Sequence, residues 1–137
     1  MISSLHVATG ALAGALLGSR SAAFAVGPVL HVLGDRMPHW DIDWREFEVW
    51  TSVGGIVALG VARGPLDPAT IGAFSSALPD AEHVLPVPRL GGRKLFPSHR
   101  YPGWHVPGGV PVGLQVVVAG AVLSGLIAAG LARRRGF

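Results

Sequence analysis

Histidines and acids at short intervals are the residues of this chain that could do chemistry. His31 and Asp35 lie four positions apart within an apolar segment, and His39 and Asp43 follow shortly after them. Residues four apart project from one face of a helix, so His31 and Asp35 could share a metal ion. Pro38 is expected to break the helix and let the later groups fold back towards His31. The alternative is a solvated loop whose aspartates cap the next helix.

Two further groups of the same residue types lie in the second half of the chain. Residues 78–83 read Leu-Pro-Asp-Ala-Glu-His, and residues 98–105 read Ser-His-Arg-Tyr-Pro-Gly-Trp-His. They add the following candidates: Asp80, Glu82, His83, His99 and His105. Because the chain has no cysteine, a metal must be held by imidazole and carboxylate groups, which suit zinc and also manganese.

The composition indicates a membrane protein. Apolar residues make up 50% of the chain, charged residues only 14%, and the mean hydropathy is +0.48, whereas a soluble domain usually carries about 25% charged residues. The net charge of +3 comes from basic residues that are spread along the chain, with one run at 133–135. That run follows the longest apolar segment, so it favours contact with lipid headgroups and not with nucleic acid.

Apolar segments predict an all-α integral membrane bundle of about five segments, some of them short or re-entrant, in a single domain over residues 1–137. The segments are residues 2–18, 22–34, 49–62, 69–78 and 110–132. Only the last meets the length of roughly 20 apolar residues that a spanning helix needs. Gly10, Gly14 and Gly18 are spaced four apart, which favours close helix packing and self-association through small-residue faces. No basic residue precedes Arg20, so no cleaved signal peptide is expected.

The order of the segments predicts where the candidate ligands meet. If all five cross a bilayer, the two long polar loops, residues 35–48 and 79–107, fall on the face where the chain begins. All six histidines and every acid except Asp67 then reach that face. Polar loops alone would collect acids, but His6 and His31 lie within apolar segments, where an ionisable side chain usually has a partner or a role. We therefore expect a metal site at one face of a multi-pass protein of a bacterial-type cytoplasmic membrane.

The motifs resemble those of a known family. His6 in the context Leu-His-x-x-x-Gly, the motif at 78–83 and the motif at 98–105 resemble the bacterial membrane-bound metal-dependent hydrolases of the YdjM-like family, and residues 31–39 also look like the zinc phospholipase C and S1-type nuclease group. Glu82 stands where the YdjM-like pattern has a second aspartate. Residues and resemblance together predict metal ligands at His6, His31, Asp35, His39, Asp80, His83 and His99. They place catalytic groups at Asp43, Glu82 and His105.

The predicted reaction is hydrolysis of a phosphoester, in a phospholipid or a lipid-linked phosphate. Two or more ions, most simply zinc with manganese as the alternative, would activate water and stabilise the leaving oxygen. Arg93, Lys94 and Arg100 would bind the phosphate or, alternatively, lipid headgroups. The rival hypotheses are a non-catalytic metal-binding membrane protein and a small transporter subunit. A transporter needs ionisable groups at the bilayer midplane, and residues 51–62 and 110–132 offer none.

Overall fold

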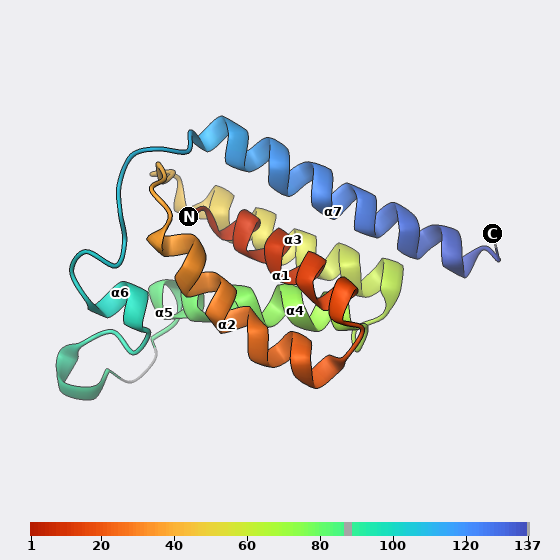
Figure 1. The fold of residues 1–137 in the computed structure, drawn as a ribbon, viewed down its shortest axis with the longest axis horizontal. Coiled ribbons are helices and arrows are strands. Elements are labelled where there is room, and N and C mark those ends of the chain that lie inside the picture. Colours follow the sequence, from red (N-terminus) through yellow and green to blue (C-terminus); the bar gives the residue numbers. More distant parts are fainter. Residues whose placement is uncertain (87–88, 137) are drawn as a thin grey trace.

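The computed structural model describes residues 1–86 and 89–136, and within them the chain is built from helices with no strand (Figure 1). The longer helices are α1 (Ser3–Leu17), α2 (Arg20–Arg36), α3 (Arg45–Arg63), α4 (Pro68–Ala77) and α7 (Val112–Arg134). The short helices between α4 and α7 are η1 (Leu78–Asp80), α5 (Ala81–Val84), η2 (Leu90–Gly92) and α6 (Pro97–Arg100). The long helices therefore form the frame, and the short helices lie together at one end of it (Figure 1).

The centre of the bundle is the close contact between α1 and α4. A Cβ atom added at Gly10 would lie 2.2 Å from the carbonyl oxygen of Gly72, and one added at Gly14 would lie 2.0 Å from the carbonyl oxygen of Pro68. Only glycine permits this approach, as the four-residue spacing led us to expect. The face that carries Gly10 and Gly14 is therefore covered by α4 of the same chain. Gly18, with φ of 64°, ends α1 in the left-handed conformation.

A small apolar core holds α1, α3, α4 and α7 together. It is built mostly from alanines, valine and leucines, because the helices approach too closely for larger side chains; its members are Val7, Ala8, Ala11, Leu59, Ala73, Ala119 and Leu123. Asp67 caps α4 by accepting a hydrogen bond from the Ala69 backbone, and its carboxylate also pairs with Arg63. These contacts fix the ends of α3 and α4 away from the histidines.

The prediction of five membrane segments is wrong. Among the described residues, α7 is the one helix long and apolar enough to cross a bilayer, judged by length and composition. At 1.5 Å per residue, α1 and α4 reach about 22 and 15 Å, against a hydrocarbon core of about 30 Å. Neither α2 nor α3 contains a sufficiently long apolar stretch, because charged residues occupy their ends. The chain is thus a helical bundle in which a multi-pass topology finds no support.

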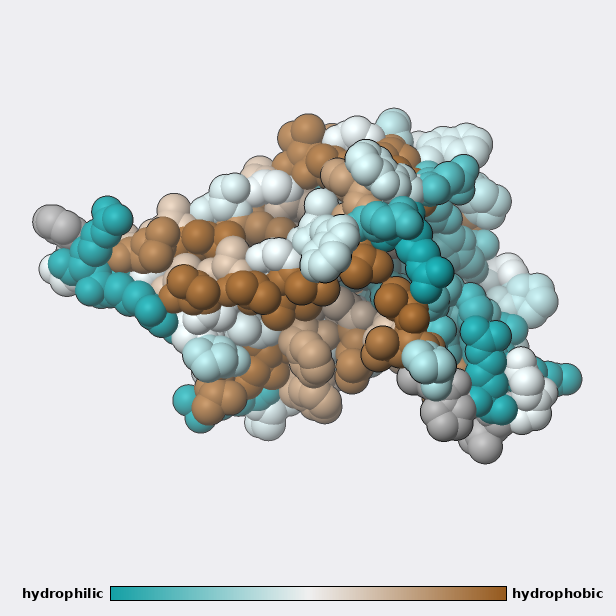
Figure 2. All heavy atoms as spheres, turned by 180° about the vertical axis from the view of Figure 1, so that it is seen from behind, coloured by the Kyte–Doolittle hydropathy of each residue, from teal (hydrophilic) through white to brown (hydrophobic). Residues whose placement is uncertain are grey.

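The surface of the bundle is divided between apolar and polar regions. Figure 2 shows hydrophobic residues in a band along the molecule and hydrophilic residues gathered mainly at its two ends. The exposed apolar side chains of α7 are Leu114, Val117, Val118 and Leu131. One end of the bundle holds the histidines and acids that could bind an ion, and at the other end Arg133 and Arg134 lie beside Arg63 and Asp67.

Candidate metal centre

Helix ends bring the candidate ligands together at one end of the bundle. His6 lies near the start of α1, and His31 and Asp35 lie in the last turns of α2. Asp80 ends η1, directly after α4, and His99 lies on α6. Residues that are up to 93 positions apart in sequence therefore share one cluster, in which Asp35 is 2% exposed and His6 and His31 are fully buried.

His31, Asp35 and His99 form the inner ligand group. The Nε2 atom of His31 lies 3.1 Å from Asp35 Oδ2 and 3.2 Å from His99 Nε2, and His99 Nε2 lies 3.5 Å from Asp35 Oδ2. In a tetrahedral site with metal–ligand distances of about 2.0–2.1 Å, neighbouring ligand atoms lie about 3.3–3.4 Å apart. The spacing of the three atoms therefore fits ligands around one ion. Asp80 Oδ1 lies 3.6 Å from the Nε2 atom of each histidine.

The far side of each inner imidazole is held by a hydrogen bond. His31 donates its Nδ1–H to the carbonyl oxygen of Ser76 at 2.8 Å, and His99 donates its Nδ1–H to Glu82 Oε1 at 2.6 Å. This arrangement leaves both Nε2 lone pairs pointing into the same space, as in metal sites whose histidines are oriented by outer partners. Two lone pairs at 3.2 Å repel each other unless a cation or proton lies between them.

Glu82 orients His99 by accepting the hydrogen bond from its Nδ1–H, on the side of the ring away from the inner ligand group. Its carboxylate accepts hydrogen bonds from the backbone N–H groups of Leu95 and Phe96 at 2.7 and 3.4 Å. Burial raises the pKa of Glu82, but these hydrogen bonds and His99 outweigh it, so the pKa lies below its usual value. Burial likewise opposes the charged form of His99, yet its interactions with the carboxylates of Asp35 and Glu82 raise the pKa of His99. The structure thus places Glu82 as an orienting partner of a ligand.

His39, His105 and Asp35 form the outer ligand group, and Asp41 lies beside them. His39 Nε2 lies 3.2 Å from His105 Nε2 and 3.1 Å from Asp41 Oδ1, and the His39 Nδ1–H donates to the Met37 carbonyl oxygen at 2.6 Å. Burial raises the pKa of Asp41, but the hydrogen bond to His39 and nearby positive charges lower it overall. The α-amino group of Met1 contacts Asp35 and His39. Because Asp35 belongs to both groups, the two groups share one carboxylate.

Backbone pairing positions the outer group. The His39 N–H donates to the carbonyl oxygen of Val106 at 3.1 Å, and the Gly108 N–H donates to the carbonyl oxygen of His39 at 2.9 Å. Gly109 permits this approach because its φ is 84° and an added Cβ would lie 2.4 Å from the Pro38 carbonyl oxygen. His39 and His105 therefore lie on two paired loop segments and not on helices.

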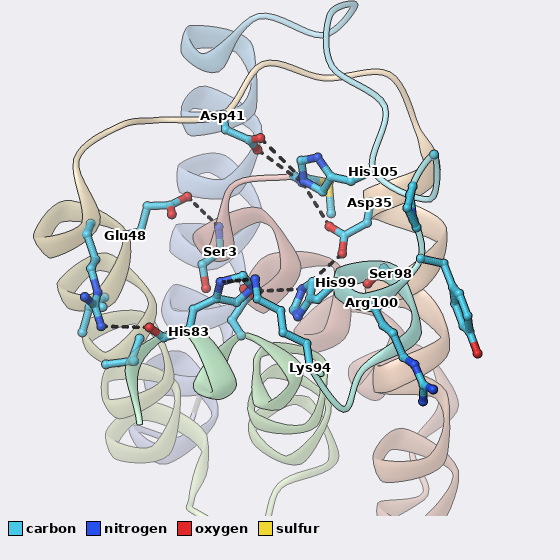
Figure 3. Close-up of a pocket in the computed structure, with 18 residues that line it drawn as sticks. Ser3, Asp35, Asp41, Glu48, His83, Lys94, Ser98, His99, Arg100 and His105 are labelled. Atoms are coloured by element: carbon cyan, nitrogen blue, oxygen red, sulfur yellow. Dashed lines mark hydrogen bonds and ion pairs between the residues drawn. The ribbon is translucent and has the colours of Figure 1, made fainter. Parts of the chain in front are cut away.

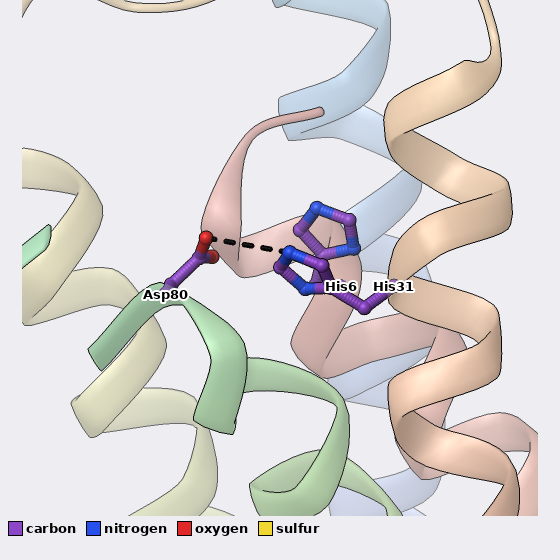
Figure 4. Close-up of side chains that lie close together, drawn as sticks. All are labelled: His6, His31 and Asp80. Atoms are coloured by element: carbon purple, nitrogen blue, oxygen red, sulfur yellow. Dashed lines mark ion pairs between the residues drawn. The ribbon is translucent and has the colours of Figure 1, made fainter. Parts of the chain in front are cut away.

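His6 lies behind the inner group. Its ring stacks on that of His31 with 3.8 Å between centroids, and these two imidazoles and Asp80 form a group that could hold an ion (Figure 4). The Nε2 atom of His6 also lies 3.0 Å from Asp35 Oδ1. Burial lowers the pKa of His6 to about 4, so the ring is neutral at neutral pH. Burial would raise the pKa of Asp35, but its interactions with His31, His6 and His99 hold that pKa well below its usual range. Asp35 is therefore a buried carboxylate anion surrounded by imidazoles.

Some of the remaining predicted residues lie at the ligands or line the cavity beside them, and others lie outside. His83 belongs to a further ligand group with Asp80 and His99, and its ring also contacts the Lys94 ammonium group, with 3.1 Å between Lys94 Nζ and His83 Nδ1. Lys94, Arg100 and His105 line a cavity of about 730 Å³ that opens beside the ligands (Figure 3). Asp43 and Arg93 are exposed and lie outside the residues that line it. The structure therefore does not bring Asp43 or Arg93 to the site.

Sequence reasoning missed several residues of the cavity wall, among them Arg45, Glu48 and Ser98. Arg45 and Glu48 lie in the first turn of α3, and Ser98 lies beside His99 with its hydroxyl group buried and without a hydrogen-bond partner among the described residues. Residues 35–48 were expected to form a loop, with the next helix beginning at residue 49, whereas α3 begins at Arg45. Because Arg45 and Glu48 are three apart, the observed helix puts them on one face, and an expected loop could not indicate this.

Two observations show that the residues suit a metal ion. Histidine and carboxylate atoms come within bonding reach of a common point in several overlapping groups. Asp35 Oδ2 and His6 Nδ1 are buried and have no hydrogen-bond partner among the described residues, and buried polar atoms normally have one. The cluster is thus positioned to bind a metal ion through imidazole and carboxylate groups.

No protein-family model, curated protein or solved structure matches the chain. Its function has to be inferred from the geometry of the site itself.

Proposed function

We propose that this protein is a divalent-metal-dependent phosphoester hydrolase. The observation that carries the proposal is the set of imidazoles around Asp35: His31, His39 and His99 each donate Nδ1–H to a fixed oxygen and turn Nε2 towards a shared buried carboxylate. Orientation of this kind has no value for a solvated surface, but it is what a metal site requires. The motif resemblance to membrane-bound metal-dependent hydrolases supports the same reaction class.

Zinc is the proposed metal, with manganese as the alternative. Nitrogen and oxygen ligands without thiolate suit both ions. The inner and outer groups would each hold one ion, and Asp35, which belongs to both groups, would be a ligand available to each. Bound divalent ions would lower the pKa of a water molecule and neutralise charge that develops on a phosphoryl group.

The cavity beside the ligands supports a phosphate-bearing substrate. Lys94, Arg45 and Arg100 bring positive charge to the wall of the cavity. Cations at this position would bind the phosphate oxygens that do not contact metal, and Arg can do so with two parallel hydrogen bonds. The apolar side chains of Val49 and Val84 also line the cavity, which suits the less polar part of an ester.

The exposed apolar surface of helix α7 supports the idea that the protein acts at a membrane. Only 17% of its most apolar stretch is buried in the protein, and exposing so much apolar area to water is unfavourable. The arginines at 133–135 follow this stretch and would contact anionic headgroups. We infer attachment to a membrane through α7 alone, with a phospholipid or lipid-linked phosphate as the substrate class.

Metal analysis combined with an activity assay tests the proposal. The purified protein should contain zinc or manganese by mass spectrometry, and it should hydrolyse p-nitrophenyl phosphate or vesicles containing phosphatidic acid. Chelation should abolish turnover and metal should restore it. Asp43→Asn, an exposed acid outside the cavity, is the matched control for Asp35→Asn. Absence of bound metal would refute the metal centre, whereas bound metal without turnover would refute only the hydrolase.

A further inference from the structure

One acid of the cavity wall belongs to none of the ligand groups. Glu48 lies in the first turn of α3, and Figure 3 shows it on the α3 side of the cavity, across from Asp35 on α2 and His99 on α6. The groups of histidines and acids that could hold an ion contain Asp35 and Asp80 but not Glu48. Glu48 therefore faces the space where a substrate would lie without being a ligand itself.

The Glu48 carboxyl group is held by the start of α1. The backbone N–H of Ser3 donates to Glu48 Oε1 at 3.3 Å. That N–H belongs to the first turn of a helix, where backbone donors have no partner within the helix. The bond uses one carboxyl oxygen and fixes the side chain, and the second oxygen, Oε2, is left to carry a proton.

The surroundings of Glu48 raise the pKa of its carboxyl group. Burial raises its pKa most, and the negative charges of Asp80 and Asp41 raise it further, against the opposing effects of the Ser3 N–H and the Met1 amino group. The other charged side chains and imidazoles that line the same cavity are Asp35, Arg45, His83, Lys94, His99, Arg100 and His105. Asp41, on the same cavity, has its pKa shifted the opposite way. Two acids whose environments separate their protonation states are typical of sites that use one as an acid.

We propose that Glu48 is the general acid that protonates the leaving oxygen of the ester; this rests on the phosphoester hydrolysis proposed above. The bond between phosphorus and the alcohol oxygen breaks while a water oxygen bonds to phosphorus. The Glu48 carboxyl proton passes to the departing alkoxide, and the proton lost by the water passes to solvent. The Glu48 carboxylate then regains a proton from solvent. One ester and one water give one alcohol and one phosphate.

The rival role for Glu48 is purely structural, as a cap for α1. Glu48→Gln separates the two roles, because the amide oxygen can still accept from the Ser3 N–H while the side chain no longer supplies an acidic proton. Glu46→Gln is the matched control, because Glu46 lies in the same turn of α3, is exposed and does not line the cavity.

Two esters with different leaving groups provide the main readout. An alkoxide from hexyl phosphate needs a proton as it leaves, whereas p-nitrophenolate leaves without one. Glu48→Gln should slow hexyl phosphate hydrolysis by about 100-fold to 10,000-fold, the usual contribution of general acid catalysis, and leave p-nitrophenyl phosphate hydrolysis close to that of the unmodified protein. The fall of the hexyl phosphate rate at high pH should disappear in Glu48→Gln and remain in Glu46→Gln.

A second readout does not depend on turnover. Carbon-13 NMR of the metal-free protein should show one glutamate carboxyl carbon that titrates above the usual range and is missing in Glu48→Gln only. Metal content should be equal in both variants and the unmodified protein. Equal loss of both activities, or loss of metal, would overturn the role of Glu48. If the unmodified protein hydrolyses neither ester, the proposed function fails and the role of Glu48 fails with it; if only the role is wrong, Glu48→Gln hydrolyses both at the original rates.

Discussion

The inner and outer ligand groups share Asp35 but are built in different ways. The inner group, His31 and His99 with Asp35, lies on helices, and its imidazoles are 0–5% exposed. The outer group depends on His39 and His105, which lie on paired loop segments, and the His105 side chain is 38% exposed. Helical packing and burial fix geometry more firmly than a short stretch of backbone pairing does. We therefore expect the inner group to bind an ion first and more tightly than the outer group does.

Replacing the shared carboxylate should have the largest effect. Asp35→Asn removes the one negative charge that both groups contact. We expect metal content to fall from two ions per chain to none, with complete loss of turnover, while Asp43→Asn retains both ions. Mass spectrometry of the intact metal-bound protein measures the count directly. Retention of one ion in Asp35→Asn would show that the two groups do not depend on a common ligand.

Removing one imidazole from each group should separate the two ions. His31→Ala is expected to abolish ion binding at the inner group. His105→Ala should abolish ion binding at the outer group only, leaving a single tightly bound ion. Manganese electron paramagnetic resonance distinguishes these cases, because two ions held by neighbouring groups that share Asp35 would be magnetically coupled and a single ion is not. A coupled signal that survives in His105→Ala would contradict the assignment of His105 to the outer group.

Changing an orienting partner should weaken one group without removing it. Glu82→Gln keeps the shape of the side chain but removes the charge that holds the His99 Nδ1–H at 2.6 Å. Loss of such a partner typically lowers metal affinity by about 10-fold to 100-fold. Competition titration with a chelating dye should show this loss at the tighter site only. Equal weakening of both sites would mean that Glu82 acts on the fold and not on His99.

The smallest effect is expected from the link between α7 and the outer group. The buried Gln115 side chain donates to the Trp40 and Val110 carbonyl oxygens at 2.8 and 3.1 Å and accepts from the Ile2 N–H. Gln115→Leu should lower the free energy of unfolding by about 1–3 kcal/mol, because it leaves the Trp40 carbonyl oxygen and the Ile2 N–H unpaired. It should weaken binding of the outer ion by less than about tenfold. Ser124→Ala, an exposed polar residue of α7, is the control. Thermal unfolding with and without metal measures both the stability of the fold and the affinity for metal. Weaker ion binding at the inner group would contradict the proposed link.

Local sequence determined the parts of the molecule that depend on near neighbours. The four-residue spacing of His31 and Asp35 places both on one helix face, as observed. Gly10 and Gly14 were expected to allow close helix contact, and α4 lies against them. The absence of cysteine limited a metal site to imidazole and carboxylate groups. Each of these inferences needed only helix geometry or ligand chemistry.

Only the tertiary structure decided which distant residues share the site and what covers the apolar helices. Glu48 and Arg45 enter the cavity because α3 starts beside it, whereas Asp43, two residues before Arg45, stays outside. Composition predicted five membrane segments because an apolar side chain has the same hydropathy whether lipid or another helix covers it. In α1 and α4 that cover is mutual, through glycine contacts. Hydropathy indicates how much apolar surface must be shielded from water. Tertiary packing determines whether another helix or lipid covers that surface.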